Sequence, residues 1–226
     1  MTGPGMSRSR WFPIGVSLSV QNHSRDFRYC ADRPSRWCNG LPVLSDERVT
    51  LREPRASDVE SLFAQVRNPT VLQYIAAAPA SVEGFGRFIR WTRVQRRNGR
   101  HLCFGIVPRG ATAAVGVIQI WPIEPDFSTA EWGFFVGEPF WGTGLFVAAA
   151  ELMLDFAFGS LGVIRLEARA VDANGRGNGI LRKLGASCEG SLRSAFRDGL
   201  HHKDHVMWSI LADEWIRRRQ RRRSIS

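Results

Sequence analysis

Val136-Gly137-Glu138-Pro139-Phe140-Trp141-Gly142-Thr143-Gly144-Leu145 is the stretch that decides the fold. An apolar strand pattern ends here in a glycine-bearing turn, and an alanine-rich helical pattern follows at once. The first amides of a helix have no intrahelical partner, and the helix dipole adds positive potential, so such a start binds phosphates. Glycines at 142 and 144 let a ligand reach the backbone with no Cβ in the way. We therefore expect a pyrophosphate here, with a merely tight strand-to-helix turn as the alternative.

The spacing of these glycines differs from both common nucleotide motifs. No third glycine follows at Val147, as the dinucleotide fingerprint requires, and the turn lacks the Walker pattern. The strands before the turn also read as a meander. Both nucleotide interpretations are therefore disfavoured.

The pattern around the turn predicts one α/β domain. Ser57 or Asp58 caps the first helix, which Pro69 ends, and Asn98-Gly99 ends the second. The long helix after the turn joins two strands. We expect strands at 47–52, 102–107, 115–123, 129–136, 163–171, 187–193 and 205–211, and helices at 57–67, 82–97, 145–158 and 177–184.

The formal charge of +10 lies at the two ends of the chain. Residues 1–45 carry six Arg and two Asp, residues 217–223 carry six Arg, and the remaining 19 basic and 19 acidic residues balance. A domain that tracks phosphates carries its basic residues on the fold itself. We interpret 1–42 as a flexible basic extension, 43–212 as the folded domain and 213–226 as an Arg-rich tail. Contact of Arg217–Arg223 with RNA or a ribosomal protein is the alternative to a solvated helical end.

Length and hydropathy fit a protein that works in water. The chain has 226 residues, which suits one domain with appendages. No stretch approaches the ~18 apolar residues that a membrane span needs. The separations of His23, Cys30 and Cys38 match no zinc pattern. We expect a cytoplasmic protein with no membrane contact and no metal.

Five segments, in this order, resemble the GNAT superfamily of N-acetyltransferases. The resemblance covers about residues 43–212 and is nearest to the Rim-type members, which acetylate ribosomal-protein N-termini and other amines. It implies an α/β (α+β) fold with a central mixed, mostly antiparallel sheet that splays at the cofactor site and is flanked by helices. The segments are Ala130-Glu131-Trp132-Gly133-Phe134, Phe140-Trp141-Gly142-Thr143-Gly144, Arg165-Leu166-Glu167-Ala168-Arg169, Asn174, and Leu181-Arg182-Lys183-Leu184-Gly185-Ala186 with Glu189-Gly190 after it.

The resemblance implies acetyl-CoA as co-substrate, with its pantetheine lying as a pseudo-strand between strands 129–136 and 163–171. Asn174 contacts the cofactor or orders a catalytic water, or instead caps the next helix. Glu138 replaces a Gln or Arg of the family pattern, and a carboxylate near a phosphate is mildly adverse. The expected cofactor residues are Phe134, Phe135, Val136, Trp141, Gly142, Thr143, Gly144, Leu145, Asn174 and Asn178.

Glu131 is the general-base candidate, because a strand carboxylate near the acyl group accepts the amine proton and burial raises its pKa. Glu167 is the second carboxylate to consider. The usual acids and a further base of the family are replaced by Gly177, Leu181 and Phe196. The acid for the leaving thiolate is therefore unassigned.

We accordingly expect direct acetyl transfer to a primary amine, of a protein N-terminus or a small molecule, with an oxyanion contact near Phe134 or Phe135. His201 or His202 could shuttle a proton. The acceptor lies between loops 69–83 and 194–204, and its identity and a homodimer stay open. The rivals are a degenerate GNAT protein that binds acyl-CoA without catalysis and a ribosome- or nucleic-acid-associated protein.

Overall fold

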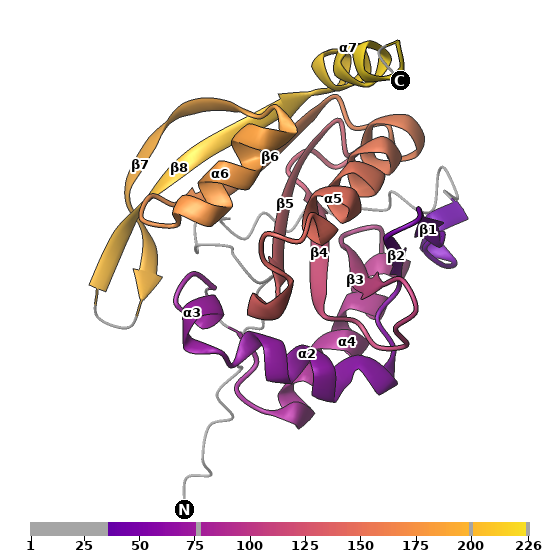
Figure 1. The fold of residues 1–226 in the computed structure, drawn as a ribbon, viewed down its shortest axis with the longest axis vertical. Coiled ribbons are helices and arrows are strands. Elements are labelled where there is room, and N and C mark those ends of the chain that lie inside the picture. The colour runs from indigo at the N-terminus through magenta and orange to yellow at the C-terminus, as the bar shows by residue number, and fades with distance from the viewer. Residues whose placement is uncertain (1–35, 76–77, 199–200, 225–226) are drawn as a thin grey trace, which may run out of the picture.

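The computed structural model describes residues 36–75, 78–198 and 201–224, and an eight-stranded sheet forms its centre (Figure 1). The strand order is β1-β2-β3-β4-β5-β6-β8-β7. Every neighbouring pair is antiparallel except β5 and β6, which are parallel because helix α5 crosses between them. The predicted fold class is therefore confirmed. The strands are β1 Leu44–Ser45, β2 Val49–Arg52, β3 Leu102–Pro108, β4 Gly116–Pro122, β5 Thr129–Val136, β6 Arg165–Val171, β7 Ser187–Asp198 and β8 His201–Leu211.

Helices cover both faces of the sheet. Helices α5 and α6 lie on one face (Figure 1), over a core that includes Trp132, Leu166 and Trp208. Helices α2 and α4 pack on the other face, against Val117 and Phe135. The helical segments are η1 Arg36–Cys38, η2 Ala56–Asp58, α2 Val59–Val66, α3 Pro69–Leu72, α4 Val82–Arg97, η3 Glu138–Phe140, α5 Leu145–Phe156, the π-helical turn η4 Ala157–Leu161, α6 Gly175–Leu184 and α7 Ala212–Arg223.

Strands β5 and β6 pair only at their beginnings. Their register runs from Thr129↔Arg165 to Glu131↔Glu167 and stops there. Beyond that point β5 keeps its partner β4 as far as Val136, and β6 keeps its partner β8 as far as Val171. The sheet is therefore splayed between the second halves of β5 and β6.

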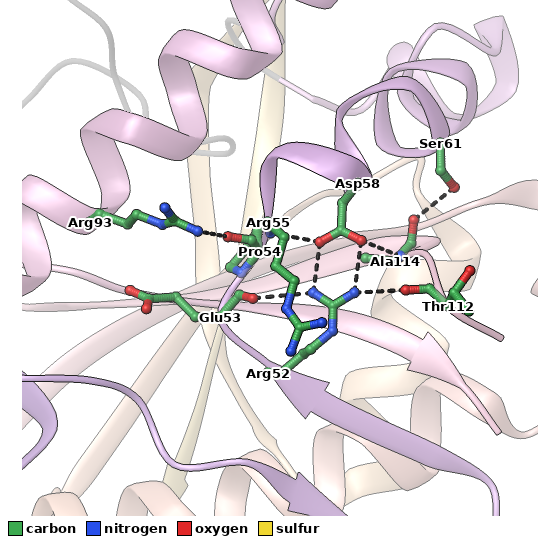
Figure 2. Close-up of polar contacts among 9 residues, drawn as sticks. All are labelled: Arg52, Glu53, Pro54, Arg55, Asp58, Ser61, Arg93, Thr112 and Ala114. Atoms are coloured by element: carbon green, nitrogen blue, oxygen red, sulfur yellow. Dashed lines mark hydrogen bonds and ion pairs between the residues drawn. The ribbon is translucent and has the colours of Figure 1, made fainter. Parts of the chain in front are cut away.

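A buried ion pair holds the start of α2 against the sheet (Figure 2). Asp58 is fully buried and receives two hydrogen bonds from the Arg52 guanidinium, at 2.7 and 2.8 Å. The backbone amides of Arg55 and Ala114 donate to the same carboxylate at 2.7 and 3.0 Å. Burial alone would raise the pKa of Asp58, but these bonds outweigh it and lower the pKa. Strand β2, helix α2 and the β3–β4 connection are thereby tied together.

The ordered structure extends beyond 43–212 at both ends. Trp37 is buried and its ring packs edge-on against Phe127, with centroids 5.4 Å apart. At the other end, Trp215 of α7 is buried and its indole N–H donates to Asp155 at 2.8 Å. Arg219 forms ion pairs with Glu151 and Asp155 of α5, so part of the Arg-rich tail is a packed helix.

The first helix ends at Val66, before Pro69, as predicted, but the helix that follows was not predicted. Pro69 is the first residue of α3, which Asn68 caps by accepting a hydrogen bond from the Thr70 amide. Proline suits this position because its missing N–H would be unpaired there anyway. The predicted loop 194–204 is mostly strand, since β7 and β8 pair as far as Asp198↔His201. Among the residues described, no helix is long and apolar enough to cross a membrane.

Candidate active site

The glycine turn between β5 and α5 adopts the conformation that glycine permits. Gly142 and Gly144 have φ angles of 75° and 83°, in the left-handed region. The Thr143 hydroxyl donates to the carbonyl of Phe140 at 2.8 Å and accepts from the Leu145 amide at 3.3 Å. These two hydrogen bonds of the Thr143 side chain hold the turn closed. The next amides of α5 have no intrahelical partner.

A cavity of about 590 Å³ begins at this turn. Strand β5, the turn, α3 and the start of α6 form its walls. Thr143 and Leu145 lie outside the lining, because the first is exposed and the second is buried in the core. The expected cofactor residues that do line the cavity are Phe134, Phe135, Val136, Trp141, Gly142, Gly144 and Asn174.

The charges around this cavity favour an anion at the turn. Helices α5 and α6 both begin at its wall, so two helix dipoles direct positive potential into it. Arg176 stacks over the Trp141 ring at 4.5 Å, and Lys183 also lines the cavity. The negative charge of Glu138 opposes this positive potential, but its carboxylate accepts a hydrogen bond from the Asn68 side chain at 2.6 Å.

A second cavity, of about 60 Å³, has Glu131 in its wall, at the point where β5 and β6 separate. We call it the acceptor chamber. Tyr74, Phe134, Asn174 and Gly177 are among the residues that line both this chamber and the larger cavity. A ligand that extends from the glycine turn along the gap would therefore bring its end to Glu131.

Glu131 has the titration behaviour of a base that works near neutral pH. The residue is 5% exposed, and burial raises the pKa of its carboxyl to about 7. Arg169, whose Nε lies 3.5 Å from Oε1, and a hydrogen bond with Trp121 oppose this rise, whereas the charge of Glu167 adds to it. Burial exceeds the opposing effects, so this carboxyl gains and loses its proton around pH 7.

Glu167, the second carboxylate considered, lies in a different environment from Glu131. It stands opposite Glu131 in register, but it lines neither cavity. Its carboxylate accepts from Arg165 Nε at 2.8 Å, and Arg165 also binds Glu189. These bonds to Arg165 and a bond from Ser209 lower the pKa of Glu189 to about 2. Glu167 therefore belongs to a structural ion-pair network.

The two asparagines of the predicted site differ. Asn174 lines both cavities, and its Oδ1 accepts from the Gly177 amide at 2.8 Å as the cap of α6. Asn178 lines neither cavity. Its amide nitrogen donates to backbone carbonyls, including that of Val171, and its oxygen accepts from the Trp208 indole at 2.8 Å. The side chain of Asn178 is therefore hydrogen-bonded within the fold, away from both cavities.

Sequence reasoning missed three polar side chains of the chamber: Tyr74, Arg169 and His205. The Tyr74 hydroxyl donates across the gap to the carbonyl of Ala173 at 3.3 Å. Burial, together with the charge of Arg169, lowers the pKa of His205 to about 4. Strand alternation from Glu167 could have found Arg169, because both point to one face. His201 and His202, which were considered instead, are exposed on β8 and line neither cavity.

Across residues 36–75, 78–198 and 201–224 there is no group of three side chains that could hold a metal ion. The features that are present are a sheet splayed at two parallel strands, a glycine turn that starts a helix in the gap, and a buried carboxyl at its apex. Together they define an acyl-CoA-dependent N-acyltransferase fold.

Comparisons with known proteins give the family. Residues 48–187 match the acetyltransferase (GNAT) domain. "Uncharacterized N-acetyltransferase p20" of Bacillus licheniformis is 26% identical over 176 residues, which cover 77% of this chain and 99% of that protein. The chain therefore belongs to the GNAT acetyltransferase family, whose members are N-acetyltransferases that use acetyl-CoA.

Solved structures of ribosomal-protein acetyltransferases share this fold. Mycobacterium smegmatis RimJ in complex with CoA-disulfide has a TM-score of 0.67 and 23% identity, over 79% of this chain and 90% of that one. The ribosomal-protein-S5-alanine acetyltransferase of Vibrio fischeri has a TM-score of 0.69 and 17% identity, over 77% and 99% of the two chains. These likenesses confirm the predicted GNAT fold.

Proposed function

We propose that this protein transfers the acetyl group of acetyl-CoA to a primary amine by direct attack, with Glu131 as the general base. The amine nitrogen attacks the thioester carbonyl and gives its proton to Glu131. The C–S bond then breaks, and the CoA thiolate takes up a proton. One observation carries the proposal: a buried carboxyl with a pKa of about 7 lies at the apex of the gap between β5 and β6.

The cofactor would lie along the 590 Å³ cavity. Its pyrophosphate fits the glycine turn and the start of α5, and Arg176 and Lys183 supply further positive charge. Its pantetheine would run along the unpaired edge of β5 towards the acceptor chamber. Asn174 remains a candidate contact, because its side chain caps α6 and also lines both cavities.

Replacing Gly142 and Gly144 together by valine is expected to weaken CoA binding at least about tenfold. A β-branched residue is strained at these φ angles, and its side chain would stand where the phosphates approach. Isothermal titration of CoA into both proteins measures the effect. Gly110→Val, at a φ of 80° in the β3–β4 connection outside both cavities, is the matched control. Equal heats from wild type and the double variant would refute the cofactor site.

The backbone amide of Phe134 is the better candidate for the oxyanion contact. The Gly137 amide donates to Val115, next to β4, and the directions of backbone amides alternate along a strand. The Phe135 amide therefore points towards β4, whereas the Phe134 amide points into the gap. A donor in the gap lies where the thioester oxygen would gain charge.

Tyr74 is the candidate acid for the leaving thiolate, since it lines both cavities. Tyr74→Phe is expected to lower kcat by about tenfold to hundredfold with little change in the dissociation constant of CoA. Thiol release measures kcat, and titration measures binding. Tyr29→Phe, at the chain's other tyrosine, is the control, and an unchanged kcat for Tyr74→Phe would remove the residue from the mechanism.

Binding of acyl-CoA without catalysis is the second candidate, because Gly177, Leu181 and Phe196 replace groups that family members use. Release of free thiol with any amine would reject it. Contact of the tail with RNA has less support, since Arg219 of α7 is engaged with Glu151 and Asp155.

A further inference from the structure

Two polar atoms on side chains of the acceptor chamber have no hydrogen-bond partner within the part of the chain that the structure describes. They are Nε of Arg169 and Nδ1 of His205, and both atoms are buried. His205 is 2% exposed. Nε of Arg169 has only the ion-pair contact with Glu131 Oε1, at 3.5 Å. Buried polar atoms in folded proteins nearly always have a hydrogen-bond partner, so two such atoms without one in a single cavity point to a ligand.

These side chains share one face of the sheet with Glu131. Glu131 pairs with Glu167 of β6, and Arg169 follows two residues later on the same face. His205 of β8 pairs with Val171, a further two residues along β6. The row Glu131, Arg169, His205 therefore runs from the apex of the gap towards its open end.

The chemistry of the pair favours an oxygen atom. Arg169 can only donate hydrogen bonds, and the imidazole of His205 is neutral at pH 7 because burial and the charge of Arg169 lower its pKa to about 4. Arg169 Nε lies 3.5 Å from Glu131 Oε1. An amine nitrogen bound to Glu131 Oε1 and an oxygen bound to Arg169 Nε, each by a hydrogen bond of about 2.9 Å, would lie within the span of an N–C–C–O unit.

We propose that Arg169 and His205 form an oxygen-binding subsite, which selects acceptors that carry a hydroxyl or carbonyl oxygen on the carbon next to the amine-bearing carbon. This inference rests on the proposed function, in which the amine reaches Glu131. Arg169 and His205 are specificity-determining residues in this scheme, and the acetyl transfer itself proceeds as described above.

Matched amines test the subsite. Alaninol and sec-butylamine differ only by a hydroxyl in place of a methyl group, and alaninamide offers a carbonyl instead. At equal concentrations of neutral amine, wild type is expected to favour alaninol over sec-butylamine by at least about tenfold in kcat/KM, because the methyl group leaves both polar atoms without a hydrogen bond. The rate with alaninamide relative to alaninol tells whether the preferred oxygen is a carbonyl or a hydroxyl.

Arg169→Met and His205→Phe are each expected to bring the ratio of alaninol to sec-butylamine close to one. Arg169→Lys keeps the positive charge beside Glu131 but removes Nε, so it also loses the preference if the hydrogen bond matters. Arg165→Met, on the same strand and face but outside the chamber, is the control and keeps the preference. A wild-type ratio near one, or a ratio that survives both substitutions, would overturn the subsite.

A binding measurement separates this inference from the proposed reaction. The acetylated products of alaninol and sec-butylamine are titrated into the protein saturated with CoA. Tighter binding of the alaninol product, kept in Glu131→Gln and lost in Arg169→Met, supports the subsite even if no amine is acetylated. Equal binding of both products by wild type contradicts the subsite whether or not the enzyme turns over.

Discussion

Glu131→Gln is expected to lower kcat by about a hundredfold or more and to leave the dissociation constant of CoA unchanged. Glutamine fills the same space but cannot take the proton of the attacking amine. Thiol release with a saturating amine measures kcat, and titration with CoA measures binding. Glu167→Gln, one strand away and outside both cavities, is the matched control and should retain most of the rate.

The pH dependence of the same variant adds a second criterion. The rate of wild type should rise with pH and reach half of its maximum near pH 7, where Glu131 loses its proton. Glu131→Gln should lack this inflection and keep only the one that belongs to the amine. A variant whose profile overlays that of wild type would rule out Glu131 as the base.

Stability measurements show whether Glu131→Gln loses activity because it unfolds. The pKa of folded Glu131 is raised above its ordinary value, so its stabilising contribution is complete below pH 4.5 and is lost as the pH rises through about 7. Above that range the ionised carboxylate disfavours the folded state. Glu131→Gln should therefore be at least as stable as wild type at pH 8 in urea, and its loss of rate would not result from unfolding.

Asp58→Ala is expected to reduce the free energy of unfolding by about 3–5 kcal/mol, the cost of leaving one partner of a buried ion pair alone. Arg52 is 7% exposed and would keep its charge without a carboxylate (Figure 2). The amides of Arg55 and Ala114 would also lose their acceptor. Urea unfolding followed by fluorescence measures the change.

A matched control and a pH series complete this test. Asp126→Ala removes an exposed carboxylate that accepts hydrogen bonds from the amide and hydroxyl of Ser128, and it should change stability by less than about 1 kcal/mol. The pKa of Asp58 is lowered, so its contribution is present above its ordinary value of 3.8 and disappears as the pH falls through the folded value. An Asp58→Ala protein as stable as wild type at pH 7 would show that the pair does not hold the fold.

The succession of strands and helices along the chain and the place of the glycine turn could be predicted from the sequence, because periodic patterns and glycine turns are set by residues close together in the chain. The role of Glu131 as the base candidate followed from its position in a family-like strand. The partners of Asn178 and Glu167 could not be predicted, because Trp208 and Arg165 reach them only when β6, β8 and α6 are assembled. Sequence position alone cannot show whether a side chain is already hydrogen-bonded to another residue of the fold.

His205 is the converse case, a residue that lines the chamber but was not predicted to do so. The sequence drew attention to His201 and His202, since neighbouring histidines in a presumed loop suggested an accessible proton shuttle. The structure continues β8 through this region, and strand alternation turns His205 inward. Only the pairing of β8 with β6 brings that ring to the acceptor chamber. Tyr74 was missed for a related reason, because the helix begun by Pro69 was not foreseen.

The place of β8 between β6 and β7 has a consequence for biosynthesis. Strand β6 has a partner along its whole length only after residues 201–211 have left the ribosome. Until then the nascent chain presents an open edge that carries Leu166, Ala168 and Ala170, and such edges recruit other chains. Pairing between strands that are this far apart in the sequence, such as β6 and β8, also forms slowly. Translation that halts before residue 201 should therefore yield an aggregation-prone product that lacks one wall of the acceptor chamber.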